Sequence, residues 1–324
     1  MNLAGNKLPN LLASAACKLP FFKGSADAHP FRRGIANLAV KATRQGKAYL
    51  VKFAVAPASK PSVFIQANYE KRIAGRISRL GISPEFLAFG SVTISGRRFP
   101  YSIQEFVPGR ELDYSKDIGS LSRLLHKLHA STNGKESICS YRILHPGAYL
   151  LKRAELDLAR RNGNSLIACF TRRAFDHLEI EPNPDDFLSL IHNDLTAENI
   201  LVTRDRPYLI DWGWAMYSSA AFDLCNFISP FTTSWESPKF LTNAQITKFL
   251  KSYFRGFSHQ TKKRIFAAFT RYWLPYNSLL ANWIYYDFLP SHETRRKSHF
   301  ASGQFLKKAF AHADIALGAF DSQG

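Results

Sequence analysis

A polar loop between short apolar runs constrains the fold of this chain more than any other stretch of its sequence. Residues 188–191 (Leu-Ser-Leu-Ile) can form a short buried strand, and residues 192–199 (His-Asn-Asp-Leu-Thr-Ala-Glu-Asn) form a largely polar loop. Residues 200–202 and 208–210 are two β-prone runs, and the polar segment between them ends at Pro207, which favours a turn. The pattern therefore predicts a strand, a loop and then a hairpin.

This framework carries three candidate functional residues. Asn199 stands at the start of the predicted hairpin and Asp211 at its end, so both face the same edge, and Asp194 lies five residues before Asn199. A carboxylate that can take a hydroxyl proton and two oxygen ligands for Mg²⁺ are the minimum equipment for moving a phosphoryl group from Mg-ATP. Any one of these residues alone reads as an ordinary polar loop residue, and their joint spacing is what favours the chemistry.

Composition narrows the class of protein and of partner. The 324 residues suffice for one large domain or two lobes, and 46% hydrophobic with 21% charged residues is typical of a globular protein. The net charge of +18 is unusual, and it comes from scattered Lys and Arg pairs rather than one basic tail. Such a surface attracts anions, so contact with anionic surfaces stays open, but no nucleic-acid-binding motif accompanies it and a nucleic-acid partner is disfavoured.

Cysteine usage and hydropathy bear on the compartment. Four cysteines stand far apart without metal-ligand spacing, which favours free thiols in a reducing compartment. No run approaches the length of a membrane span. The apolar start, residues 8–17, is short and broken by Pro9 and Asn10, so we expect a docking helix in an extension over residues 1–30 rather than a signal peptide. A cytoplasmic protein is therefore expected.

The order of elements predicts an α+β fold of two lobes. The first lobe, residues 1–107, carries β-prone runs and a helix over residues 61–80, on which Ile65, Tyr69, Ile73 and Ile77 recur every four residues. Pro108-Gly109 looks like a connection between lobes. The second lobe, residues 108–324, is mainly helical.

Lys52 and Glu70 are the candidate nucleotide ligands of the first lobe. Lys52 stands among apolar neighbours in a β-prone run, so it either points into a cleft or faces solvent. Glu70, on the following helix, could hold the ammonium by an ion pair, as kinase chemistry requires, or be one more charge on a solvated helix face.

The remaining nucleotide candidates are backbone sites. Gly34 and Asn37 mark a turn that could cover phosphates, although the full G-x-G-x-x-G is absent. A P-loop motif is also absent, which excludes the P-loop nucleotide fold. At the end of the first lobe, backbone groups of the segment from Gln104 to Val107, including those of Glu105 and Val107, could pair with an adenine edge.

Together these residues resemble the aminoglycoside phosphotransferase/choline kinase superfamily, which has a protein-kinase-like fold. The loop from His192 to Asn199 is similar to the family's H-x-D-x-x-x-x-N, Asp211-Trp212 to its metal-binding step, and Phe222-Asp223-Leu224 to the segment that follows in choline-kinase-like members. The resemblance implies ATP and Mg²⁺ as cofactors and a small-molecule hydroxyl acceptor. It implies that Asp194 orients the acceptor hydroxyl or accepts its proton, and that Asn199 and Asp211 coordinate magnesium.

One departure from the family concerns the residue two positions after Asp211. Gly213 stands where choline-kinase-like members typically carry an acidic residue, which leaves the acceptor open. The resemblance also implies that His192 supports the loop by hydrogen bonds and that Asp223 ties the loop to the helical lobe.

Acceptor identity is expected to depend on the helical lobe. Residues 231–324 hold 13 Lys and Arg against five acidic residues, which disfavours a polycationic aminoglycoside. A choline- or thiamine-like amino alcohol or a sugar derivative is expected instead. Aromatic residues of 272–286 could form a cage for a quaternary ammonium, although those at helical spacing are more typical of core packing.

We therefore expect a small-molecule kinase. An antibiotic phosphotransferase is the alternative within the family. A non-catalytic module that binds an anionic partner is the alternative outside it, because the glycine turn is incomplete and the acid at position 213 is missing.

Overall fold

The computed structural model describes residues 7–23, 26–33, 36–56, 62–159, 165–176, 178, 186–291, 299–300 and 302–321. It divides into two compact units. Unit 1 comprises Met1–Arg110 and Leu201–Trp214, and unit 2 comprises Glu111–Ile200 and Ala215–Gly324. The segment with Asp211 thus groups with the N-terminal unit, whereas Asp194 and Asn199 belong to the other.

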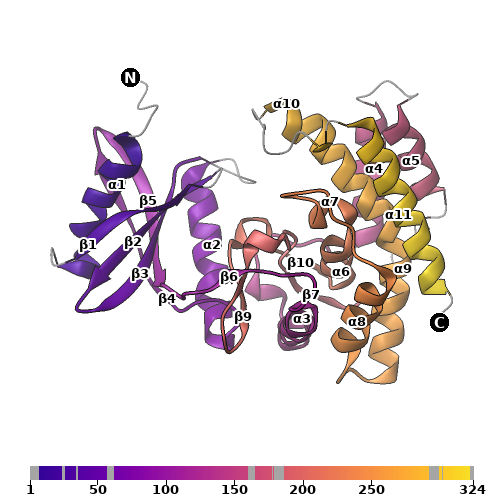
Figure 1. The fold of residues 1–324 in the computed structure, drawn as a ribbon, viewed down its shortest axis with the longest axis horizontal. Coiled ribbons are helices and arrows are strands. Elements are labelled where there is room, and N and C mark those ends of the chain that lie inside the picture. The colour runs from indigo at the N-terminus through magenta and orange to yellow at the C-terminus, as the bar shows by residue number, and fades with distance from the viewer. Residues whose placement is uncertain are drawn as a thin grey trace. The chain divides into compact units, whose positions relative to one another are not determined.

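Unit 1 is built on a five-stranded antiparallel sheet with the order β1-β2-β3-β5-β4 (Figure 1). Its strands are β1 (Asp27–Arg33), β2 (Asn37–Arg44), β3 (Lys47–Ala54), β4 (Phe86–Ile94) and β5 (Arg97–Glu105). The β2–β3 turn contains Gly46 and the β4–β5 turn Gly96, both at positive φ, which glycine adopts without strain. Each turn closes a hairpin, β2–β3 in the first case and β4–β5 in the second.

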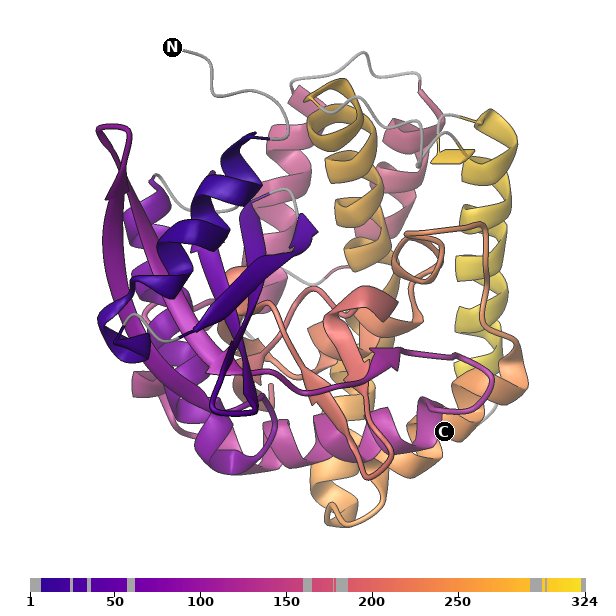
Figure 2. The same ribbon diagram turned by 60° about the vertical axis from the view of Figure 1, so that its left-hand side comes forward.

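Helices cover both faces of this sheet. Helix α1 (Lys7–Cys17) buries Leu12 and Ala16 in a core that also contains Val51 and Phe53 of β3. Lys52, which alternates with these two residues, faces the other side, where α2 (Val63–Ile77) packs. The alternation along β3 therefore separates an apolar face, covered by α1, from the face that carries Lys52. Figure 2 shows α1 lying across the sheet.

The residues predicted to form the buried face of α2 are mostly buried. Tyr69, Ile73 and Ile77 are buried, but Ile65 is 52% exposed. The helix begins at Val63, with Ser62 as its N-cap, and Gln66 rather than Ile65 is the buried residue of its first turn.

Unit 1 also contains the predicted hairpin after the polar loop. Strand β8 spans Ile200–Val202 and β9 spans Pro207–Leu209, and Leu209 N–H donates to the Ile82 carbonyl at 2.9 Å. The 3-10 turn Trp212–Trp214 follows, and the Trp212 indole N–H donates to Ser83 Oγ at 3.3 Å. These bonds fix the segment that carries Asp211 onto the N-terminal unit.

Unit 2 is mainly helical, with α9 (His259–Asn282) packed against α4, α5, α6 and α11. Its other elements are α3 (Ile118–Thr132), α4 (Pro146–Ala159), α5 (Leu166–Phe175), β7 (Leu188–Ile191), β10 (Met216–Ser219), α6 (Ala221–Ile228), α7 (Pro230–Thr233), α8 (Asn243–Phe254), the π-helix Trp283–Phe288, α10 (Leu289–Ser291) and α11 (Gly303–Asp321), with β6 (Arg110–Glu111) at the unit boundary. The expected α+β fold, an antiparallel sheet followed by a helical part, is confirmed. In the described part of the chain, no helix is long and apolar enough to cross a membrane.

Candidate active site

Three charged side chains meet in unit 1. Lys52 Nζ lies 2.9 Å from Glu70 Oε2 and 2.9 Å from Asp211 Oδ1. The ion pair between Lys52 and Glu70 that the sequence suggested is present, and Asp211 is a second partner. The part of these residues in nucleotide binding stays a prediction.

The cluster fixes the charge of the lysine. Burial disfavours the ammonium, but the adjacent charges of Asp211 and Glu70 outweigh it, so the pKa of Lys52 is raised above its ordinary value. The side chain of Lys52 is 15% exposed, whereas that of Asp211 is 43% exposed. The cluster therefore presents a permanent cation beside a carboxylate that a metal ion can reach.

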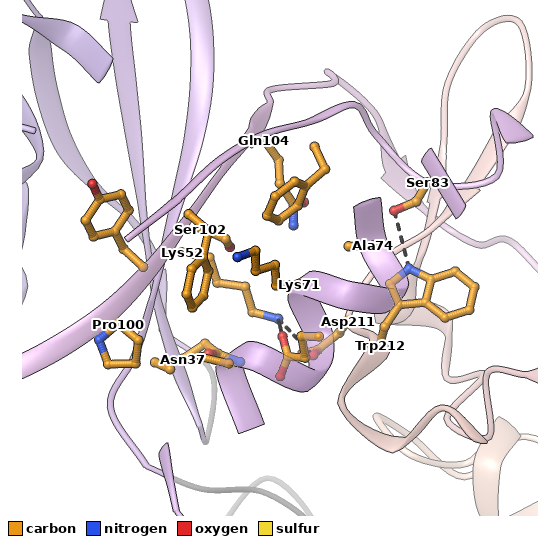
Figure 3. A pocket seen from close by; sticks show the side chains of 16 residues that line it. Asn37, Lys52, Lys71, Ala74, Ser83, Pro100, Ser102, Gln104, Asp211 and Trp212 are labelled. Carbon is orange, nitrogen blue, oxygen red and sulfur yellow. Dashed lines mark hydrogen bonds and ion pairs between the residues drawn. The ribbon is translucent and has the colours of Figure 1, made fainter. Parts of the chain in front are cut away.

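A pocket that is open to solvent adjoins this cluster (Figure 3). Figure 3 shows Lys52 extending toward Asp211, and Trp212 turned toward Ser83. Lys71 also lines the pocket, so two cations and the carboxylates of Glu70 and Asp211 share its wall. Such a wall suits a ligand that carries both phosphate and metal charge.

Asp211 has a backbone conformation that residues other than glycine rarely adopt. Its φ is +65°, in the left-handed region that Asp and Asn tolerate better than most residues. It follows β9 directly and precedes the Trp212–Trp214 turn, so the unusual φ aims its carboxylate at Lys52. Strain of this kind is typical of functional positions.

The other predicted nucleotide residues of unit 1 differ in how the structure places them. Asn37 lines the pocket, and Gly34 lies outside the described residues. The pocket is lined near the end of β5 by Gln104 and not by Glu105 or Val107. Glu105 N–H donates to the Glu85 carbonyl, and Val107 lies beyond the sheet, so a role of their backbone toward adenine stays a prediction.

In unit 2 the polar loop brings Asp194 and Asn199 together. Asn199 Nδ2 donates to Asp194 Oδ2 at 2.8 Å and to the Asp194 carbonyl at 2.9 Å. Since the nitrogen of the Asn199 amide is used inside the loop, its oxygen Oδ1 is the atom left for a metal ion. The same bonds hold the Asp194 carboxylate in one orientation.

A buried carboxylate of α6 anchors the start of this loop. Asp223 is fully buried and accepts hydrogen bonds from His192 N–H at 2.8 Å and Asn193 N–H at 2.7 Å. His129 Nε2 lies 3.1 Å from the same carboxylate, and His129 Nδ1 lies 2.8 Å from Tyr253 Oη. Asp223 therefore ties the loop to two helices of unit 2.

Two residues that the sequence did not single out fix the rest of the loop. Asn226, one turn after Asp223, accepts from Leu195 N–H at 2.6 Å. Tyr276 donates its hydroxyl to Asn193 Oδ1 at 2.7 Å, and burial with the charge of Asp223 raises the pKa of Tyr276, so the hydroxyl stays a donor. Asn193 has φ +61°, a conformation that these bonds hold.

Replacing Asp223 by Ala is expected to cost stability. The change leaves buried donors without an acceptor, and each such donor costs about 1–3 kcal/mol. We therefore expect the free energy of unfolding to fall by about 3 kcal/mol or more and the Tm to fall by roughly 5–10 °C. Thermal unfolding followed by circular dichroism measures it. Asp314→Asn, which breaks only an exposed ion pair with Arg173, is the control and should change stability by less than about 1 kcal/mol. Equal Tm values for the two variants would contradict the anchoring role.

The residues assigned to magnesium suit that ion chemically. Mg²⁺ prefers oxygen ligands and binds beside nucleotides through one or two carboxylates plus phosphate oxygens. Asp211 offers a partly exposed carboxylate, and Asn199 offers its amide oxygen. Among the described residues no cluster of three or more His, Cys, Asp and Glu side chains forms a closed metal site.

The aromatic residues of the helical unit fall into two sets. Tyr272, Trp273 and Tyr276 are almost fully buried, so the core packing that helical spacing favoured for Trp273 and Tyr276 is present. Trp283 is partly exposed and stacks on Trp235, with ring centroids 5.9 Å apart and an interplanar angle of 20°. The buried rings of Phe288 and Phe300 also contact Trp235.

This aromatic pair is connected to the polar loop. Trp235 Nε1 donates to Glu198 Oε1 at 3.1 Å, and Glu198 is the residue before Asn199. Sequence reasoning missed Trp235 and Glu198, because they stand 37 residues apart and neither has a helical or strand pattern that pairs them.

Comparison with known proteins identifies the family. Residues 27–272 match the model of the phosphotransferase enzyme family, so the chain belongs to this family and is a phosphotransferase that acts on a hydroxyl acceptor. A segment of 78 residues is 35% identical to Protein LicA of Haemophilus influenzae and spans 23% of each chain.

Solved structures show the same fold. A choline/ethanolamine kinase family protein from Mesorhizobium loti is similar with a TM-score of 0.64 at 19% identity, over 96% of this chain and 98% of that one. An amicoumacin kinase solved with AMP-PNP and Ca²⁺ is similar with a TM-score of 0.61 at 14% identity, over 93% of each chain. The kinase-like fold expected from the polar loop is confirmed.

Proposed function

We propose that the protein is an ATP- and Mg²⁺-dependent kinase that phosphorylates the hydroxyl of a small cationic amino alcohol. The Lys52–Glu70–Asp211 cluster is the observation that carries the kinase proposal, because a buried cation beside an accessible carboxylate is equipped to bind Mg-ATP. The nucleotide and divalent ion bound to the amicoumacin kinase support the choice of cofactors. A kinase that uses ATP is expected in the cytoplasm.

Each residue has a defined part in the proposed reaction. Lys52 binds nucleotide phosphate, and Glu70 keeps the ammonium in place. Asp194 orients the acceptor hydroxyl and takes its proton. Asn199 and Asp211 hold magnesium, which when bound screens the charge of the phosphates. That residues of both units serve one reaction rests on the family pattern of the loop.

The surroundings of the polar loop favour a cationic acceptor. Glu198 supplies a half-buried carboxylate within four residues of Asp194, and its partner Trp235 supplies an aromatic surface. A carboxylate with an aromatic ring is the combination that attracts an ammonium group by charge and by cation–π interaction. The choline/ethanolamine kinase family protein is similar in fold and supports the same class.

Substitutions at these two residues test the acceptor class. We expect Glu198→Gln and Trp235→Leu each to raise the KM for the amino alcohol about tenfold, because an ion pair or a cation–π contact of about 1–2 kcal/mol is lost. The KM for ATP should stay within about twofold. Steady-state ATP consumption with choline, ethanolamine, thiamine, a neutral sugar and an aminoglycoside measures both constants.

The matched control neutralises a carboxylate elsewhere in unit 2. Glu136→Gln breaks an exposed ion pair with Arg142 and should leave both KM values unchanged. Turnover of the neutral sugar with no response to Glu198→Gln would reject the cationic acceptor and keep the kinase. Turnover of an aminoglycoside alone would favour the antibiotic phosphotransferase.

A further inference from the structure

Gln66 is buried beside the Lys52–Glu70–Asp211 cluster, and the proposed reaction gives this side chain no role. It lies on α2, one helical turn before Glu70, and is 0% exposed. Its Nε2 donates to Glu70 Oε1 at 2.9 Å and to the Gly213 carbonyl at 3.3 Å. A buried amide is costly unless it is hydrogen-bonded, and these bonds satisfy its nitrogen.

The first bond fixes the carboxylate that holds Lys52. Glu70 uses Oε1 to accept from Gln66 and Oε2 to accept from Lys52, each at 2.9 Å. With both oxygens engaged, the carboxylate is held against rotation, and the position of the ammonium is fixed in turn. Gln66 therefore acts on Lys52 through Glu70.

The second bond fixes the other partner of Lys52. Gly213 follows Asp211 by two residues in the Trp212–Trp214 turn, so the bond to its carbonyl ties α2 to the segment that carries Asp211. One amide thus links the two carboxylates that flank Lys52. Loss of the amide would loosen both ion pairs together.

Gly213 leaves space for the Gln66 amide, and its backbone angles do not call for glycine. It is absent from the residues with positive φ, so its conformation is open to other residues. A Cβ at this position would lie 2.8 Å from Gln66 Nε2 and 3.2 Å from Glu70 Oε1, which is too close for the amide to stay in place. A longer acidic side chain would also add negative charge beside Glu70 and Asp211. Choline-kinase-like members typically carry an acidic residue at this position. The glycine found here instead leaves the room that the amide of Gln66 occupies.

We propose that Gln66 is a positioning residue for the nucleotide-phosphate site and that Gly213 is glycine because it makes room for Gln66. This rests on the proposed function, since the cluster they hold is the one assigned to Mg-ATP. Gln66 touches neither phosphate nor metal in this scheme and acts through Glu70 and the Asp211 segment.

A double-mutant cycle tests the pair. Gln66→Met keeps the length of the side chain but removes its donors, and we expect it to raise the Kd for Mg-ATP about tenfold. Gly213→Ala should have a similar effect, because the added Cβ displaces the amide. In the Gln66→Ala background, where the amide is gone, Gly213→Ala should change the Kd by less than about twofold, so the effects should not add.

Gly75→Ala is the matched control. Gly75 lies on the same helix, and a Cβ there would meet only Phe86 Cδ1, at 3.9 Å. It should leave the Kd unchanged. The KM for ATP should rise in Gln66→Met while the KM for the acceptor stays near that of the unaltered protein, because positioning affects only the nucleotide side.

The outcomes separate the inference from the proposed function. Unaltered protein that binds no Mg-ATP overturns the proposed function and the inference with it. Unaltered protein that binds Mg-ATP, together with a Gln66→Met variant of equal affinity, overturns the inference alone. If Gly213→Ala raises the Kd for Mg-ATP in the Gln66→Ala background as much as in the unaltered protein, the inference alone is overturned. The two residues would then act independently.

Discussion

Asp194→Asn is expected to reduce kcat for phosphoryl transfer by about 10³-fold, because the amide cannot take the acceptor proton. The loop should keep its shape, since Asn199 Nδ2 can donate to the oxygen of the new amide as it does to Asp194 Oδ2. Affinity for Mg-ATP should stay within about twofold, because this residue serves the acceptor. Single-turnover kinetics with labelled ATP, together with calorimetric titration of the nucleotide, measures the two quantities.

A control on the exposed hairpin turn makes this result specific. Asp205→Asn makes the same chemical change at an exposed residue and should leave kcat unaltered. Loss of Mg-ATP binding in Asp194→Asn, in step with the loss of kcat, would mean that the loop supports the nucleotide rather than the acceptor. Retained kcat would show that the proton goes elsewhere.

Asp211→Asn is expected to remove the effect of magnesium on nucleotide binding. The carboxylate is 43% exposed and is the charged ligand assigned to the metal, so its neutralisation should abolish a gain in affinity of about tenfold or more. The same change also weakens the ion pair with Lys52, so affinity without magnesium should fall as well, by a smaller factor. Titration of ATP with and without Mg²⁺ separates the two effects.

Lys52→Met gives the comparison for this prediction. It removes the cation but leaves the metal ligands, so nucleotide affinity should fall while its dependence on Mg²⁺ persists. An Asp211→Asn variant that still responds to Mg²⁺ like the unaltered protein would contradict the assignment of the metal to Asp211.

The sequence predicted those parts of the fold that depend on neighbours along the chain. The hairpins of unit 1 and the β8–β9 hairpin follow from β-prone runs around turn residues, and they are present. The spacing of Asp194 and Asn199 in one loop likewise predicts a local contact, which the structure contains. Local periodicity was less reliable at Ile65, where the start of α2 turns this apolar residue toward solvent.

The parts that could not be predicted depend on contacts between distant segments. Gln66 reads in the sequence as one polar residue on a helix, and its role follows only from the approach of Gly213, 147 residues later. Glu198 and Trp235 meet in the same way, across 37 residues. Conversely, helical spacing favoured core packing for Trp273, and the structure buries it together with Tyr272 on the central helix α9.

Whether this protein is a kinase that uses Asp194 is decided by transfer of the labelled γ-phosphoryl group from ATP to an acceptor, measured side by side for the unaltered protein and Asp194→Asn. With Mg²⁺ present, we expect label on a cationic amino alcohol with the unaltered protein and about 10³-fold slower labelling with the variant. Equal labelling by the two proteins, or no labelled acceptor and no bound Mg-ATP with the unaltered protein, would contradict the account.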